Sequence, residues 1–108
     1  MKFLSRKEEL ILLTIWKLED NAYGVTIREA ISKSTKKYWS IGAIYDVLDR
    51  LVSKGYVSTS ISAPLAERGG KSRKYYLLTK KGYKALVEIK TIAETMWSDL
   101  PIPLLKRG

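Results

Sequence analysis

The chain has 108 residues, the length of one domain, and its 20 Lys and Arg against 11 Asp and Glu give a formal net charge of +9. It has no cysteine and no histidine, which excludes disulfides and removes the commonest general base. No Ser or Thr lies in a nucleophile motif and no Asp-rich loop could hold a metal ion, so neither an enzyme nor a cofactor is expected. The longest apolar run, Leu10 to Trp16, is too short to cross a bilayer, which predicts a soluble cytoplasmic protein.

The positive charge is concentrated in the second part of the chain. Residues 1–67 hold ten cations and eight anions, whereas residues 68–108 hold ten cations and three anions. Clustered positive charge attracts polyanions, so nucleic acid leads the expected partners, ahead of an anionic membrane surface or an acidic protein.

Two helices are predicted near the N-terminus. Ser5 and Glu8 have the spacing of a capping box, which predicts a helix over residues 5–19. Its apolar residues cover more than one stripe, so we expect burial on two sides, one of them against another subunit. A turn over 19–24 leads to a helix over about 24–36, whose inward residues are expected to be Val25, Ile27, Ala30 and Ile31.

A third helix is predicted to begin at the N-cap Ser40 and to end at Gly55. The spacing of its apolar residues predicts an inward stripe of Ile41, Ile44, Leu48 and Leu51. The outward face then consists of Gly42, Ala43, Tyr45, Asp46, Asp49 and Arg50.

A hairpin and a last helix complete the order. Alternation of Val57, Thr59 and Ile61 predicts a half-buried strand, a second strand covers 73–79, and residues 63–72 form a long tip. A helix from the N-cap Thr79 to about Trp97 then carries apolar or small residues spaced by four and three. That spacing suits packing along another helix, either in a second subunit or in the same domain. The residues with this spacing are Gly82, Leu86, Ile89, Ala93 and Met96.

Three helices followed by a hairpin is the order of a winged helix-turn-helix, in which the third helix enters the DNA major groove and the hairpin lies over the flanking backbone. Asp46 and Asp49 would repel phosphate, so contacts from the third helix are expected at its first turns: Ser40, Gly42, Ala43 and Tyr45. In the hairpin they are expected from Arg68, Gly69, Gly70, Lys71, Arg73 and Lys74, with the glycines at positive φ. The alternatives are a solvated charged turn for the hairpin tip, and close internal packing for Gly42 and Ala43.

The segments YGVTIREAI, WSIGAIYDVLDRLVSKGYV and ERGGKSRKYYLLTKKGYKAL resemble those of PadR-family transcriptional regulators, from about Leu4 to Leu86 in unbroken order. The resemblance implies a repressor that binds an inverted-repeat operator as a homodimer, joined through its C-terminal helix with help from the first. Tyr45 matches the third-helix tyrosine that touches the DNA backbone, and residues 68–71 match the wing tip. Asp46 departs from the pattern, because many relatives have proline there.

The C-terminal part is short, with one helix where longer members of the family have several. Any effector pocket would therefore form between subunits, and by resemblance Met96 and Trp97 could take a small aromatic compound there. The predicted dimer interface comprises Leu86, Ile89, Ala93, Met96 and Trp97.

The expected fold class is mainly α with a β-hairpin (α+β). A winged helix-turn-helix over residues 1–79 precedes a dimerisation helix and tail over 80–108. The alternative function is a winged-helix interaction module that docks an acidic protein without binding DNA. Membrane binding is disfavoured because the most basic stretch is a hairpin rather than an amphipathic helix.

Overall fold

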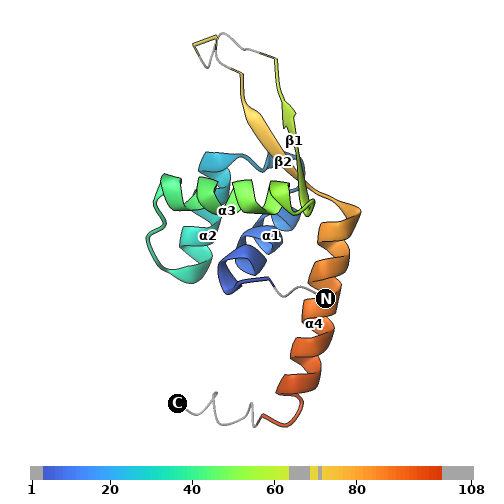
Figure 1. Ribbon diagram of the computed structural model, residues 1–108. Helices are drawn as coiled ribbons and strands as arrows, with labels where there is room; N and C mark the ends of the chain where they lie inside the picture. The colour runs from blue at the N-terminus through green and yellow to red at the C-terminus, as the bar shows by residue number, and fades with distance from the viewer. Residues whose placement is uncertain (1–3, 64–68, 71, 101–108) are drawn as a thin grey trace.

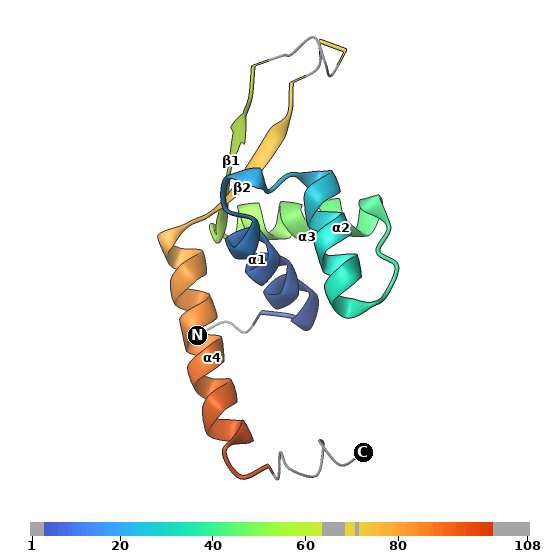
Figure 2. The same cartoon turned by 180° about the vertical axis from the view of Figure 1, so that it is seen from behind.

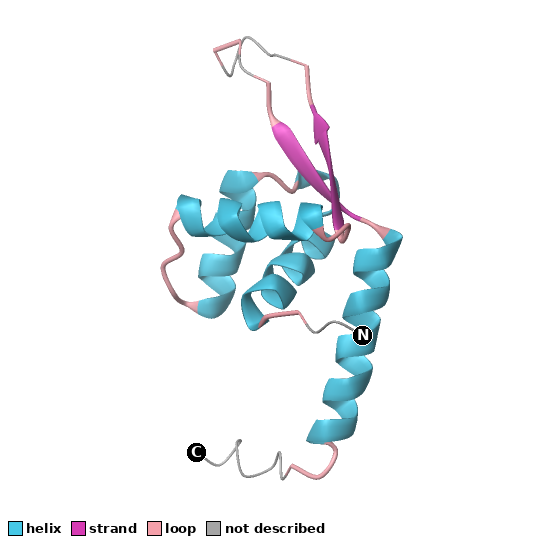
Figure 3. Cartoon of the chain, viewed as in Figure 1, coloured by secondary structure: helices cyan, strands magenta, loops and turns pink. Residues whose placement is uncertain are grey.

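The chain forms three helices, a two-stranded hairpin and a fourth helix in a computed structural model that describes residues 4–63, 69–70 and 72–100. Figures 1 and 3 show the hairpin at one end of the molecule, and the last helix starting beside the base of the hairpin and extending past the other helices toward the opposite end. This arrangement confirms the α+β winged-helix fold class. The elements are α1 (Arg6–Leu18), the short 3-10 helix η1 (Glu19–Asn21), α2 (Gly24–Thr35), α3 (Ile41–Ser53), β1 (Val57–Ile61), β2 (Lys74–Leu78) and α4 (Lys80–Trp97).

The core lies between α1, α2, α3 and the base of the hairpin. Most of its residues are branched aliphatic side chains, joined by Ala22, Tyr56 and Tyr76, and all are buried. They include Ile11, Leu12, Ile15, Ile27, Ile31, Ile44, Leu48, Leu51, Val57 and Tyr76. The inward stripe expected for α3 is confirmed at three of its four positions.

The exceptions lie in the first turns of α2 and α3. Val25 and Ile41, both expected to face inward, are 47% and 39% exposed, whereas Val47 is buried. Val25 is the second residue of α2 and Ile41 is the first residue of α3. Helical spacing predicts which face of a helix points inward, but it does not show how far the neighbouring helix extends. Val25 and Ile41 are predicted to face inward for that reason and are exposed.

The predicted capping box at the start of α1 is confirmed. The Ser5 amide donates to Glu8 Oε1 at 2.8 Å, and the Glu8 amide donates to Ser5 Oγ at 3.1 Å. The Glu8 carboxylate is buried and also accepts a 2.6 Å hydrogen bond from Lys54 Nζ, just past the end of α3. Burial opposes ionisation of this group, but the hydrogen bonds from Lys54 and Ser5 outweigh it and hold the pKa of Glu8 below its usual value. Glu8 thus ties the start of α1 to the end of α3.

The hairpin contacts the core through Val57 at its base and through Tyr76 in the middle of β2. β1 and β2 are antiparallel, with Val57 opposite Leu78 and Ile61 opposite Lys74. Val57 is buried, but Ile61 is 64% exposed, so the predicted alternation of buried and exposed side chains along β1 is wrong beyond its first residue. The reason is visible in Figure 1, where both strands extend past the helices and leave nothing for the later residues to pack against.

α4 begins at Thr79, whose side chain accepts from the Gly82 amide at 3.1 Å, and it then projects away from the helices (Figures 1 and 2). A Cβ at position 82 would lie 2.8 Å from Leu78 Cδ1 and closer still to the Tyr56 carbonyl oxygen. Gly82 therefore serves packing within the chain. None of the helices in the described ranges is both long and apolar enough to span a membrane.

Candidate nucleic-acid interface

The first turn of α3 is open to solvent. Ser40 Oγ accepts from the Ala43 amide at 3.1 Å, which confirms Ser40 as the N-cap. A Cβ built on Gly42 would have no heavy atom within 4 Å, whereas Ala43 is half-buried. Internal packing therefore does not explain Gly42, and its bare backbone faces outward.

Tyr45 connects α3 to the start of α2. Its side chain is 43% exposed, yet its ring lies against Gly24, where a Cβ would be 2.9 Å from Tyr45 Cζ. Gly24 is the first residue of α2, and the first amides of a helix have no carbonyl one turn earlier to accept from them. The Tyr45 hydroxyl and the positive end of α2 therefore lie at one place on the surface.

Tyr23 and Tyr75 also lie at this place on the surface, although neither is predicted from the sequence as a site residue. The Arg73 guanidinium lies 4.0 Å from the centre of the Tyr23 ring, and the Tyr23 and Tyr75 rings meet edge to face at 5.5 Å. The Tyr76 amide also donates to the Ala22 carbonyl at 2.8 Å, so the residues before α2 pair with β2. The sequence feature that could have identified Tyr23 as a site residue is its position immediately before Gly24, the glycine that begins α2.

Arg73, predicted from the sequence as a wing cation, is thus stacked over the entrance to α2 and does not project freely from the hairpin. We refer to Tyr23, Gly24, Tyr45 and Arg73 as the α2 entrance cluster. It brings together residues from the start of α2, from α3 and from the wing.

The wing tip has the backbone expected of it. Gly69 and Gly70 have φ of 68° and 77°, and no heavy atom lies within 4 Å of a Cβ built on either. Lys74 is exposed and its Nζ lies 5.7 Å from the centre of the Tyr76 ring. The other two predicted tip cations, Arg68 and Lys71, lie outside the described residues.

Tyr76 lies beneath the acidic part of α3. Burial raises the pKa of its hydroxyl, and nearby Tyr45 and Asp49 raise it further. Asp46 and Asp49 are both exposed on α3. A polyanion that approaches α3 would therefore meet negative charge along its middle and the uncharged Gly42 at its start.

The residues predicted for the dimer interface do not share one exposed face of α4. Leu86 packs partly against the core of its own chain, and Ile89 and Ala93 are half-buried. Met96 and Trp97 are exposed, at 76% and 51%. Leu86 thus packs within the chain near the start of α4, the end of the helix is uncovered, and the dimer interface itself stays a prediction.

An apolar groove of about 450 Å³ runs between α1 and α4. Large exposed side chains line it, including Trp16 at 56%, Tyr83 at 53% and Val87 at 46%, and Leu86 and Ala93 also contribute. Trp16 belongs to the apolar residues of α1 that cover more than one side of the helix. Exposed apolar area of this kind is typical of a surface that another chain covers.

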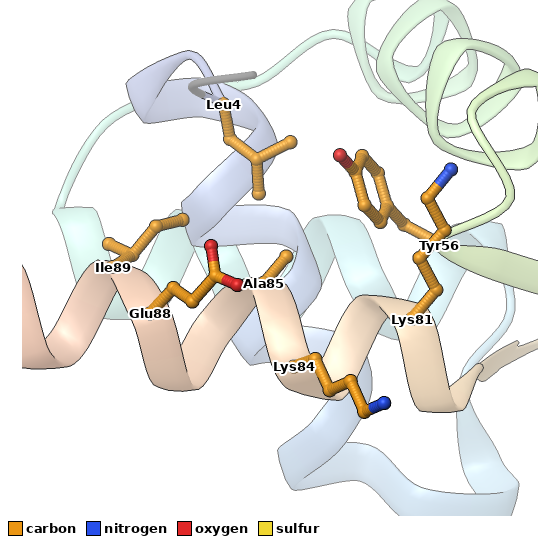
Figure 4. A pocket seen from close by; sticks show the side chains of 7 residues that line it. All are labelled: Leu4, Tyr56, Lys81, Lys84, Ala85, Glu88 and Ile89. Atoms are coloured by element: carbon orange, nitrogen blue, oxygen red, sulfur yellow. The ribbon is translucent and has the colours of Figure 1, made fainter. Parts of the chain in front are cut away.

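The start of α4 is fixed to the end of α3 by Lys81. Its Nζ donates to the Lys54 carbonyl at 2.7 Å and lies 5.0 Å from the centre of the Tyr56 ring. Figure 4 shows Lys81 beside Tyr56 in a pocket of about 520 Å³, with Glu88 further along α4 and Leu4 across from the helix. These contacts tie the start of α4 to the end of α3.

A helix-turn-helix followed by an antiparallel wing, with an exposed first turn on the third helix, defines the class of winged-helix DNA-binding proteins. Residues 11–88 match the transcriptional regulator PadR-like family, and the chain belongs to that family. It is accordingly a DNA-binding transcription regulator and not an enzyme.

Solved structures agree with this assignment. A PadR-like transcriptional regulator from Bacillus cereus is 30% identical, with a TM-score of 0.71 and coverage of 92% of this chain and 90% of that chain. A PadR-like transcription factor from Bacteroides fragilis is 28% identical, with a TM-score of 0.68 and coverage of 94% and 89%. RosR from H. salinarum is 26% identical, with a TM-score of 0.70 and coverage of 89% and 79%. A comparison with curated proteins found no match.

Proposed function

We propose that this protein is a cytoplasmic homodimeric repressor that binds an inverted-repeat operator, with α3 in the major groove and the wing over the flanking backbone. The observation that carries the proposal is the α2 entrance cluster. The Tyr45 hydroxyl lies beside the first residue of α2 and Arg73 stacks on Tyr23, the residue before it, which supports a contact with a DNA phosphate at this place.

The cluster suits a phosphate because each of its parts offers a donor or positive charge. Arg73 carries a permanent charge, and its stacking on Tyr23 fixes the guanidinium in one place. Tyr45 is held against Gly24 and presents its hydroxyl beside the first amides of α2. A phosphate held there would set the register of α3 along the groove, with Ser40, Gly42 and Ala43 at the base edges.

The wing would add charge on one flank. Residues 68–84 include seven cations and no anion, among them Arg68, Lys71, Arg73 and Lys74. The open backbone at Gly69 and Gly70 allows a close approach to the DNA. Neutralising several phosphates releases counterions, so the duplex affinity should fall steeply as salt is added.

The homodimer would form on α4 and α1. A second copy could cover the groove between them with the same exposed residues, Trp16, Tyr83 and Val87, as a twofold interface requires. Residues 80–108 then act as the dimerisation unit and residues 1–79 as the DNA-binding unit. A small aromatic effector would bind between subunits at Met96 and Trp97, both exposed in one chain.

The substitution Gly24→Ala tests the cluster directly. The new methyl would displace the Tyr45 ring, which can move because it is part-exposed, so the fold should survive. Losing a hydrogen bond to phosphate should weaken binding to a duplex selected from a random pool by about tenfold. Tyr45→Phe should give a similar loss, and the double variant should lose little more, because both changes remove the same contact.

Ser34→Ala serves as the control, since it removes an exposed hydroxyl from the C-terminal turn of α2, at the other end of that helix from the cluster. Fluorescence anisotropy gives each Kd, and thermal unfolding checks the fold. Unchanged affinity in Gly24→Ala and Tyr45→Phe would remove the cluster from the DNA interface. Failure of the unaltered protein to bind any duplex at low salt would favour the protein-interaction alternative.

A further inference from the structure

A second basic surface lies apart from the wing, at the turn between α2 and α3. A pocket of about 780 Å³ opens there between the first turns of α1, the residues after α2 and the first turn of α3. Figures 1 and 2 place the α2–α3 connection on the opposite side of the helices from α4. The pocket is therefore separate from the groove between α1 and α4 and from Met96 and Trp97.

The charge of this pocket is positive. Arg6, Lys7 and Lys37 line it, and its lining includes no carboxylate. Glu9 approaches Arg6 at 3.7 Å, but the Arg6 side chain is 78% exposed, so that ion pair neutralises it only weakly. Three cations around one opening suit a multiply charged anion such as a phosphate group.

The same pocket has an aromatic wall that is held in place. Trp39 Nε1 donates to Thr35 Oγ1 at 3.0 Å, and the Thr35 hydroxyl donates to the Ile31 carbonyl at 2.7 Å. The Trp39 ring is half-buried against the core, and Leu10 continues the apolar surface. Tyr38, at the rim, is 83% exposed. A fixed indole beside an exposed phenol provides faces on which a planar ring can stack.

We propose that this pocket binds a free nucleoside phosphate, with its base on Trp39 and Tyr38 and its phosphates at Arg6, Lys7 and Lys37. The volume lies within the range of small-molecule pockets, and cations beside aromatic faces match the two halves of such a ligand.

A nucleotide bound in the pocket would change the affinity for duplex, because Ser40 and Ala43 line the pocket and also lie at the start of α3. This coupling rests on the proposed function, whereas nucleotide binding itself does not. By linkage, a nucleotide that changes the duplex affinity must have its own affinity changed by duplex to the same degree.

Nucleotide binding is measured without DNA on the full chain. In the Trp16→Phe, Trp97→Phe variant, Trp39 is the single remaining tryptophan, because the chain has three. ADP should quench its fluorescence on excitation at a wavelength that the base does not absorb, and calorimetry on the unaltered chain should return the same Kd. Adenosine, ribose 5-phosphate and inorganic phosphate should each bind at least about tenfold more weakly, since each lacks one half of the ligand.

Lys37→Glu should weaken ADP binding by at least about tenfold, since it replaces an attraction by a repulsion. The matched control is Lys17→Glu, which makes the same change of charge outside the pocket. Lys17 lies about 15 Å along α1 from the pocket residue Lys7, so this substitution should change the Kd for ADP by less than about twofold. No ADP binding at millimolar concentration, or equal binding of ADP and inorganic phosphate, would overturn the proposal.

Duplex binding distinguishes a free nucleotide from DNA as the occupant. If the pocket takes a free nucleotide, the apparent Kd for ADP should reach a limiting value as the selected duplex is added, as linkage between two separate sites requires. An apparent Kd that rises in proportion to duplex concentration without limit would mean that DNA phosphate occupies the pocket, which would overturn this proposal and leave the proposed function standing.

Discussion

Gly42→Ala should separate folding from DNA binding at one residue of α3. No heavy atom lies within 4 Å of the new Cβ. Gly42 is the second residue of α3, and its φ is not positive, so alanine fits the backbone there. Alanine is favoured over glycine in helices by about 0.5–1 kcal/mol, and the lower end applies near a helix terminus. For a chain of this size, a gain of about 0.5 kcal/mol raises the Tm by about 2–4 °C.

The same methyl would stand between the α3 backbone and the DNA. If that backbone approaches base edges closely, the intrusion should weaken binding by about tenfold, or about 1.4 kcal/mol. Thermal unfolding followed by circular dichroism gives the Tm, and fluorescence anisotropy on the selected duplex gives the Kd. Ser34→Ala, on the exposed C-terminal turn of α2, is the control that should stabilise the helix without affecting DNA.

Two results would refute this reasoning about Gly42. A lower Tm would mean that Gly42 serves packing after all. A raised Tm with unchanged duplex affinity would mean that the first turn of α3 does not approach DNA closely.

Other substitutions test the rest of the structure. Gly82→Ala should lower the free energy of unfolding by about 1–2 kcal/mol in urea titrations, because its Cβ meets the backbone carbonyl of Tyr56, and unchanged stability would contradict that packing. Glu8→Gln should cost about 2 kcal/mol at pH 7, because it removes the charge that pairs with Lys54 and replaces one of the two oxygens that accept from Lys54 and the Ser5 amide by a donor. The folded pKa of Glu8 lies below its usual 4.5. The difference in free energy of unfolding between this variant and the unaltered protein should therefore be full above pH 4.5 and shrink as the pH falls through the folded pKa. A difference independent of pH would exclude the ionised pair. Val87→Glu, at an exposed position of the α1–α4 groove, should yield a stable monomer in sedimentation velocity, and a persistent dimer would exclude this face.

The sequence predicts those parts of the fold that depend on residues close together in the chain. The capping residues Ser5, Ser40 and Thr79 act on amides three residues later, so local spacing suffices to find them. The positive φ of Gly69 and Gly70 likewise follows from the turn that those residues must make.

The remaining features depend on contacts between distant segments, which spacing does not encode. The exposure of Ile61 depends on how far the hairpin reaches beyond the helices, and the burial of Glu8 depends on Lys54, 46 residues later. The same holds for the site. A pattern of small and polar residues indicates the start of α3, but only the fold shows that Tyr45 lies against Gly24 and that Arg73 stacks on Tyr23.

The proposed function requires that a dimer of this protein recognises a particular DNA sequence. The most direct measurement is an anisotropy titration against duplex from the region upstream of its own gene and against a shuffled duplex, at two salt concentrations. We predict tight binding to the first duplex only, at one dimer per site, with an affinity that falls as salt is added. Equal binding to both duplexes, or no binding to either at low salt, would contradict the claim.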